Sequence, residues 1–195
     1  MQNWDEIVRS YKPRLHAASG PVLVLGAADG RLMDALRRQG LEVIGCEPSA
    51  RLTRFARQTY GFDECTLQCS EPDAFLEWLN RIGRKVQAVF LWRVLEHTFN
   101  PYILLRQTAA VLDEEGLAIV EVIPPASDDN CKIRFRLTRE DAIVQTAIQC
   151  GLELESIDCD FDNSFSAFVF QKIFIPRSGP VSFFRTVGAT AVSRV

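Results

Sequence analysis

The segment VLVLGAADG, residues 22–30, decides the fold of this 195-residue chain. Its first four residues have no polar face, which is typical of a central parallel strand covered by helices on both sides. The small residues Gly26 to Gly30 then predict a turn into a helix, where a ligand can approach backbone amides. A helix start that only packs tightly on the sheet would also favour small residues. In both cases the segment predicts the first strand, loop and helix of an open α/β sheet.

Composition and charge are those of one globular domain. Apolar residues make up 47% and charged residues 24% of the chain, and the formal net charge is -3, so we expect no nucleic-acid partner. The six cysteines show no metal-ligand spacing with the two histidines, and we expect no metal site. Without an apolar stretch of bilayer length or a basic leader, we expect a cytoplasmic protein with reduced thiols and no membrane partner.

Short apolar runs alternate with amphipathic helical stretches, which predicts parallel strands joined by crossover helices. The last two runs, residues 152–157 and 166–173, have no helix between them and should pair antiparallel. The predicted fold is an α/β, Rossmann-like, doubly wound sheet, mostly parallel and seven-stranded, with an antiparallel C-terminal hairpin strand. The earlier strands are expected at residues 22–25, 42–46, 65–68, 86–92 and 117–123.

Several boundaries follow from local signals. Asp29, Ser49 and Ser70 stand where helix N-caps are expected, since short polar side chains accept the orphan amides of a first turn. We expect a single domain over residues 1–175, opened by an N-terminal helix. The tail at residues 176–195 either docks on a partner subunit, giving a homodimer, or is a loosely held terminus.

An acidic residue follows the second strand. Glu47 lies about twenty residues beyond Gly26, at the offset where a carboxylate accepts both hydroxyls of a ribose. Ligands of open α/β sheets bind beyond the carboxyl ends of the strands, so both motifs belong to one candidate site. Alone, Glu47 could equally be a surface glutamate in a strand-to-helix turn.

Together with a third region, these motifs resemble class I S-adenosylmethionine-dependent methyltransferases. VFLWRVLEH, residues 89–97, and LDEEGL, residues 112–117, are similar to the fourth-strand region and the turn before strand five in the small-molecule branch, methyltransferase types 11, 12 and 23. The resemblance covers about residues 22–122 well and the rest by topology only. It implies methyl transfer from S-adenosylmethionine, leaving S-adenosylhomocysteine, to an oxygen, nitrogen or carbon atom of an unidentified small molecule.

The resemblance also implies roles for individual residues. The loop amides approach the methionine part of the cofactor, Glu47 holds the ribose, and adenine lies near Pro48 and the loop after strand three. Glu71 stands beside that loop, and Trp4 and Tyr11 of the opening helix could cover the cofactor. The implied cofactor-binding residues are Gly26, Ala27, Ala28, Asp29, Gly30, Glu47, Pro48, Cys69, Ser70 and Trp92.

Acceptor contacts are expected from Arg93, His97 and the loop at residues 126–135. His97 is the candidate catalytic base, because a histidine titrates near neutrality, or else it has a structural role in the loop. Arg93 could favour a carboxylate or phosphate on the substrate, or could pair with Glu96 or Glu121.

Two departures from the family pattern keep alternatives open. Val24 stands where an acid is usual, and Ala28 where a glycine is usual, with a methyl group that would hinder a positive φ. These departures motivate a non-catalytic methyltransferase-like binding or scaffolding protein. A nicotinamide-dependent oxidoreductase is a further alternative, but its G-x-G-x-x-G loop would require glycines at Ala28 and Arg31.

Overall fold

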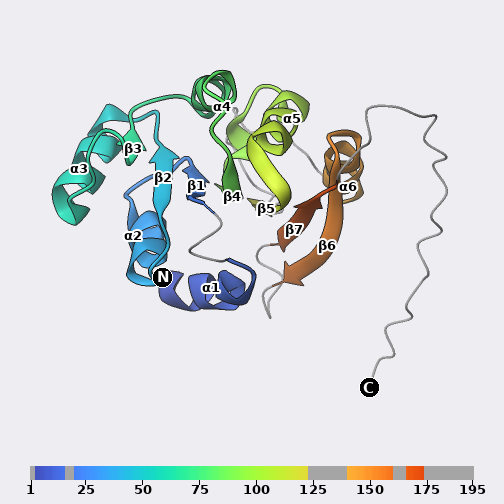
Figure 1. Cartoon of the computed structure of the whole chain (residues 1–195), viewed down its shortest axis with the longest axis horizontal. Helices are drawn as coiled ribbons and strands as arrows, with labels where there is room; N and C mark the ends of the chain where they lie inside the picture. Colours follow the sequence, from blue (N-terminus) through green and yellow to red (C-terminus); the bar gives the residue numbers. More distant parts are fainter. Residues whose placement is uncertain (1–2, 16–19, 123–139, 160–165, 174–195) are drawn as a thin grey trace, which may run out of the picture.

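A single mixed sheet forms the centre of the molecule (Figure 1). The computed structural model describes residues 3–15, 20–122, 140–159 and 166–173. Seven strands follow the order β3-β2-β1-β4-β5-β7-β6, with β7 antiparallel to both of its neighbours. The predicted mostly parallel sheet with an antiparallel C-terminal hairpin is therefore confirmed. The strands are β1 (Val22–Leu25), β2 (Val43–Cys46), β3 (Leu67–Gln68), β4 (Val86–Trp92), β5 (Leu112–Val122), β6 (Leu152–Cys159) and β7 (Ser166–Lys172).

Helices cover both faces of the sheet (Figure 1). One face carries α1, α2 and α3, and is called here the α1 face; the other carries α4, α5 and α6. The α-helices are α1 (Trp4–Tyr11), α2 (Arg31–Arg38), α3 (Ala50–Tyr60), α4 (Pro72–Arg81), α5 (Pro101–Val111) and α6 (Glu140–Gln149). Two short 3-10 helices, η1 (Lys12–Arg14) and η3 (Leu95–His97), follow α1 and β4.

The central strands are buried along their whole length, as their apolar sequence predicts. Every residue of β1 and β4 is buried, and two hydrophobic cores lie on the two faces of the sheet. Gly45 of β2 lets α2 come close, because a Cβ there would lie 2.8 Å from the carbonyl oxygen of Val24 and 2.9 Å from the sulfur of Met33. This close approach packs the first turn of α2 against β2.

Two of the expected caps differ from the structure. Ser49 caps α3 as predicted, accepting a hydrogen bond from an amide of the first turn at 3.4 Å. The N-cap of α2 is Gly30 rather than the expected Asp29. The Asp29 carboxylate accepts a 3.3 Å hydrogen bond from the amide of Arg31, the first helical residue. Glu71, not Ser70, is the N-cap of α4, where a proline in the first turn removes one orphan amide.

Several strand bounds also differ from the prediction, those of β3 and β5 among them. β3 is shorter than expected because the Asp63 carboxylate accepts the Thr66 amide at 2.7 Å, which closes a turn before the strand. β5 begins at Leu112, and its pairing with β4 then jumps forward across a bulge. Glu115 takes a φ of 64° in this excursion.

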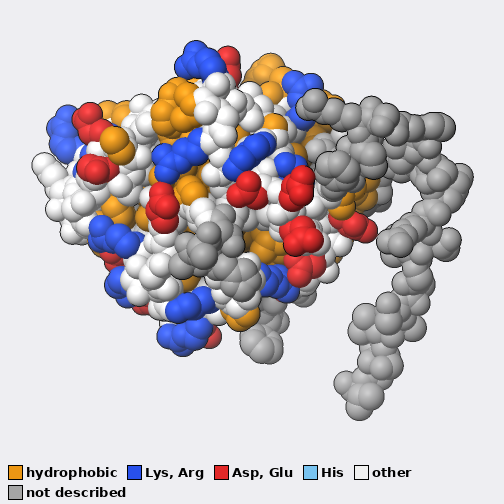
Figure 2. Space-filling model, in the orientation of Figure 1, with side chains coloured by type: hydrophobic (Ala, Val, Ile, Leu, Met, Phe, Trp, Pro, Cys, Tyr) orange, Lys and Arg blue, Asp and Glu red, His pale blue; other side chains and the backbone are white. Residues whose placement is uncertain are grey.

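Charges on the face seen in Figure 2 are mixed, with basic and acidic side chains side by side. Among the residues that the structure describes, no helix is long and apolar enough to cross a membrane, and no three or more His, Cys, Asp or Glu side chains could hold a metal ion. The expected domain end at residue 175, the tail and the loop at residues 126–135 lie outside the described residues.

Candidate cofactor and acceptor site

A cavity of about 940 Å³ opens at the carboxyl ends of β1, β2 and β4. This is the sheet edge where the sequence places the candidate site, and the volume lies in the range of small-molecule pockets. The first turns of α2, α3 and α4, together with α1 and the segment after β4, form its remaining walls. The expected site residues that line it are Gly26, Ala27, Ala28, Asp29, Glu47, Pro48, Trp92, Arg93 and His97; Gly30, Cys69 and Ser70 are not among its lining residues.

The glycines of the first loop are required for different reasons. Gly26 has a φ of 65°, and a Cβ there would lie 2.9 Å from a methyl carbon of Val94. Gly30 has a φ of 85°, and its Cβ would lie 2.7 Å from the Cβ of Ala56 in α3. Tight packing therefore explains Gly30, whereas Gly26 both packs against the loop after β4 and lines the cavity.

Ala28 adopts the left-handed conformation that its methyl group disfavours. Its φ is 48°, and the residue is exposed at the cavity wall. Its amide donates a 2.9 Å hydrogen bond to Oε2 of Glu47. The glycine that the family pattern leads one to expect at this position would remove the backbone strain.

Glu47 is held rigidly at the end of β2. Its side chain is buried, with 7% of the residue exposed, so it is not a surface glutamate. Oε2 accepts the Ala28 amide and Oε1 accepts the Ser49 amide, each at 2.9 Å. Each carboxylate oxygen can accept further hydrogen bonds, so Glu47 can still accept hydrogen bonds from two hydroxyl groups while bound to the two amides. Sequence reasoning missed that Glu47 also ties the two loops together.

The lining beyond Pro48 comes from α4 rather than from the end of β3. Glu71 and Asp73 reach the cavity, while the Cys69 thiol lies 3.7 Å from the carbonyl oxygen of Pro48. Burial raises the pKa of the Asp73 carboxyl. Sequence reasoning missed Asp73, although its place one residue after the helix-starting proline was the available signal.

The loop after β4 forms the opposite end of the cavity. Arg93 has a φ of 57°, and its Nε and Nη2 each donate to Oε1 of Glu121 at 3.4 Å. Glu121 is fully buried, whereas 46% of the Arg93 side chain is exposed. Of the two carboxylates expected as partners, Arg93 thus pairs with Glu121; the Glu96 oxygens have no hydrogen-bond partner among the described residues.

The opening helix contributes one aromatic wall. Trp4 lines the cavity and contacts Trp92 edge to face, with ring centroids 5.5 Å apart. Tyr11 instead packs edge to face on Phe90 at 5.8 Å, away from this cavity. Thr98 and Phe99 also line the cavity and were not anticipated from the sequence. The site therefore has an acidic end near β2 and α4, and an end with aromatic rings, an arginine and a histidine near β4.

Comparison with solved structures agrees with this geometry. A magnesium protoporphyrin IX methyltransferase from Synechocystis, with bound S-adenosylhomocysteine, is 15% identical with a TM-score of 0.68 over 87% of this chain and 82% of that chain. An S-adenosylmethionine-dependent methyltransferase from Archaeoglobus fulgidus is 14% identical, with a TM-score of 0.68 over 86% and 92%. A TehB-like enzyme from Corynebacterium glutamicum is 17% identical, with a TM-score of 0.66 over 89% of each chain. At such identities the likeness shows the fold.

Family membership rests on the sequence itself. No curated protein matches the chain. The family described as "Methyltransferase domain" matches residues 3–154, which is most of the chain and includes every residue expected in the site. The match agrees with the expected S-adenosylmethionine cofactor, which the Synechocystis neighbour carries as its product form. The predicted membership is confirmed: this chain belongs to the methyltransferase domain family.

Proposed function

We propose that the chain transfers the methyl group of S-adenosylmethionine to a small molecule bound in the 940 Å³ cavity. The observation that carries the proposal is the buried Glu47 carboxylate, fixed by two backbone amides beside a loop of small residues. Such a carboxylate is already oriented, so binding two ribose hydroxyls requires little further ordering. The match to the methyltransferase family supports the same activity.

Residues around Glu47 would hold the cofactor. The loop from Gly26 to Asp29 would contact its methionine part, and Pro48 would contact the adenine ring, with Asp73 within the same wall. Glu71 lines that wall too, whereas Cys69 and Ser70 do not line the cavity. Bound S-adenosylmethionine supplies a methyl group made electrophilic by its sulfonium.

Residues at the β4 end would position the acceptor. Trp92 and Trp4 shield this end from water, which favours transfer along the line between acceptor atom and methyl carbon. An acceptor lone pair forms the new bond as the carbon–sulfur bond breaks, and its electrons remain on sulfur. His97 would take the acceptor's proton where there is one, and Arg93, held by Glu121, would donate hydrogen bonds to the acceptor.

Thermal melting with S-adenosylhomocysteine tests the cofactor half of the proposal. Ligand at 100 times its Kd should stabilise the folded chain by about 2.7 kcal/mol, which raises the Tm by about 5 to 10 °C. NADH at the same concentration should leave the Tm unchanged. A shift with NADH alone would instead indicate an oxidoreductase.

Turnover tests the other half. Transfer of radiolabelled methyl groups from S-adenosylmethionine to a pool of small amines, phenols and acids should label at least one acceptor. Tight S-adenosylhomocysteine binding without labelling of any pool would indicate a non-catalytic methyltransferase-like protein. A cytoplasmic location and a homodimer formed through the tail also stay predictions; size-exclusion chromatography with and without residues 176–195 tests the dimer.

A further inference from the structure

A second cavity, of about 290 Å³, lies on the α1 face beside the first. Trp92 lines both cavities, so the two adjoin at this residue. The second cavity is otherwise bounded by residues of α1 and η1, among them Tyr11 and Arg14, and by Asp158 and Ala167 of the β6–β7 hairpin. Nothing in the proposed methyl transfer uses its polar groups.

A bulge in β6 directs Asp158 into this cavity. Leu154 pairs with Phe170, but Ser156 pairs with Val169, so Glu155 is an extra residue in the strand. Phe170 belongs to the core on the face of α4 to α6, whereas Val169 belongs to the core under α1. Without the bulge, side-chain alternation would turn Asp158 away from α1.

Asp158 thereby completes a row of side chains across four strands. Trp92 is registered with Glu121, Glu121 with Ala167, and Ala167 with Asp158. Residues paired in this way point to the same face of a sheet. Two carboxylates and an indole therefore lie in one line beneath α1, separated by the small Ala167 side chain.

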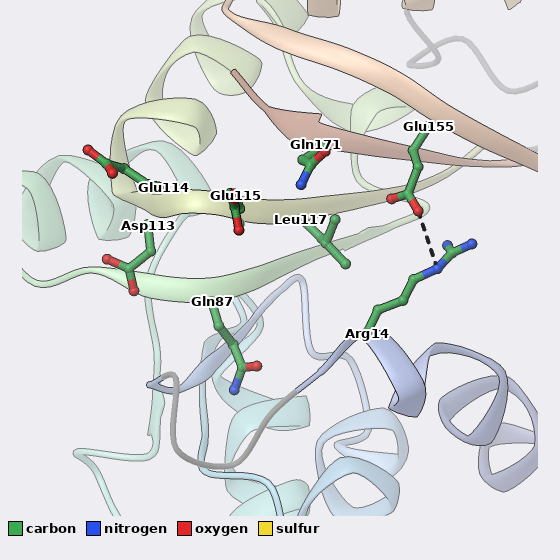
Figure 3. Close-up of a pocket in the computed structure, with 9 residues that line it drawn as sticks. Arg14, Gln87, Asp113, Glu114, Glu115, Leu117, Glu155 and Gln171 are labelled. Carbon is green, nitrogen blue, oxygen red and sulfur yellow. Dashed lines mark ion pairs between the residues drawn. The ribbon is translucent and has the colours of Figure 1, made fainter. Parts of the chain in front are cut away.

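In the described part of the chain, the two arginines near this row, Arg14 and Arg93, are each paired with another carboxylate. Arg14 contacts Glu155 at 3.5 Å, and Figure 3 shows its guanidinium directed toward that residue. Arg93 pairs with Glu121. Asp158 accepts a hydrogen bond from the Tyr11 hydroxyl at 3.3 Å, and among the described residues it forms no ion pair.

The pKa of Tyr11 shows that negative charge predominates around its hydroxyl group. Its pKa is raised first by burial and then by the negative charges of Asp158 and Glu121, against an opposing effect of Arg14. The acidic neighbours thus outweigh the basic one at the phenol. Arg14 also lines the cavity, but its ion pair is with Glu155, and among the described residues Asp158 has none. Such a carboxylate, beside the aromatic rings of Tyr11 and Trp92, favours an ammonium group.

We propose that the second cavity binds the protonated amine end of the methyl acceptor, with Asp158 as its counter-ion. The acceptor's reacting atom would lie across Trp92, in the first cavity, so this inference rests on the proposed function. Arg93 does not oppose it, because Glu121 already matches that charge. The substrate class is therefore a small amine with a second, separate nucleophilic group.

Calorimetric titration of the full chain tests the inference, in the presence and absence of saturating S-adenosylhomocysteine. The probes are phenethylamine and 2-phenylethanol, which differ in the charged group. Phenethylamine should bind about tenfold or more tightly than the alcohol, since a charge-assisted hydrogen bond is lost in the alcohol. This comparison on the unmodified protein requires no variant to fold.

Asp158→Asn and Glu153→Gln form the matched pair of variants. Asn keeps an acceptor for the Tyr11 hydroxyl but removes the charge, so it should abolish the preference for the amine. Glu153 is an exposed acid of the same strand that lines neither cavity, and its variant should keep the preference.

The outcomes separate the two proposals. Normal S-adenosylhomocysteine binding with equal affinity for amine and alcohol, or with a preference that survives Asp158→Asn, overturns the amine site and leaves the proposed function standing. Failure of S-adenosylhomocysteine to bind overturns the proposed function, and with it the assignment of this cavity to an acceptor.

Discussion

Replacing Ala28 by glycine should stabilise the protein. The left-handed φ of 48° at this alanine costs about 1 to 2 kcal/mol relative to an ordinary conformation. Glycine removes that strain but adds about 0.4 to 1 kcal/mol of entropy to the unfolded chain. The Ala28 methyl group is exposed, so little burial is lost. We expect a net gain of about 0.5 to 1 kcal/mol in the free energy of unfolding, or about 1 to 4 °C in Tm.

Ala27→Gly is the matched control, one residue away. Ala27 is 5% exposed and is not among the positive-φ residues, so glycine there loses a buried methyl and gains only backbone freedom. That variant should lower the free energy of unfolding by about 1 to 2 kcal/mol. Urea denaturation of both variants beside the parent protein, with m held common, measures the two changes.

The opposite signs of the two substitutions are the critical result. Equal destabilisation by Ala28→Gly and Ala27→Gly would refute the strained geometry assigned to Ala28. Because the Ala28 amide still donates to Glu47 in the variant, its affinity for S-adenosylhomocysteine should not fall.

Three further substitutions test the site and its support. Glu47→Ala leaves two loop amides without their acceptor, so it should lower the free energy of unfolding measured in urea by about 2 to 4 kcal/mol. The variant should also bind S-adenosylhomocysteine about tenfold or more weakly, as measured by calorimetry. Unchanged affinity would remove Glu47 from the site. Gly30→Ala should lower the free energy of unfolding by about 2 to 4 kcal/mol, because its Cβ would lie 2.7 Å from the Cβ of Ala56. The control Gly40→Ala, at a φ of 81° with open space around it, should lower it by about 1 to 2 kcal/mol. Similar losses in the two variants would contradict tight packing at Gly30. Because the pKa of Tyr11 is raised in the folded protein, the neutral phenol stabilises the fold fully below about pH 10, and this stability falls at higher pH as the unfolded tyrosine ionises. Tyr11→Phe should flatten this alkaline loss of stability in urea melts at a series of pH values. An unchanged slope would contradict the raised pKa.

Patterns local to the chain were enough to predict the architecture. The unbroken apolar runs of β1 and β4 indicated buried parallel strands, and the missing helix between β6 and β7 indicated the hairpin. The offset between Gly26 and Glu47 depends only on the length of one strand–helix–strand unit. Such features are fixed by nearest neighbours and periodicity, and the sequence expresses them directly.

Features set by tertiary register could not be read in this way. The bulge at Glu155 contains no glycine that would indicate it in the sequence, yet it determines on which face of the sheet the Asp158 side chain lies. Ala28 combines its positive φ with a hydrogen bond to Glu47 of another loop, and Arg93 pairs with Glu121 of a neighbouring strand. Each depends on two segments meeting at one residue, which periodicity does not encode.

The place of β7 in the sheet has a consequence for synthesis of the protein. This strand lies between β5 and β6, and its residues 166–172 supply the backbone partners of both. A nascent chain that has emerged from the ribosome only as far as β6 therefore still exposes the hydrogen-bonding edge of a buried strand. The parallel part can assemble earlier, but the hydrophobic edge at Leu117 to Val122 is covered only after β7 has been translated. Nonsense mutations upstream of residue 166 should therefore yield fragments that self-associate through this edge.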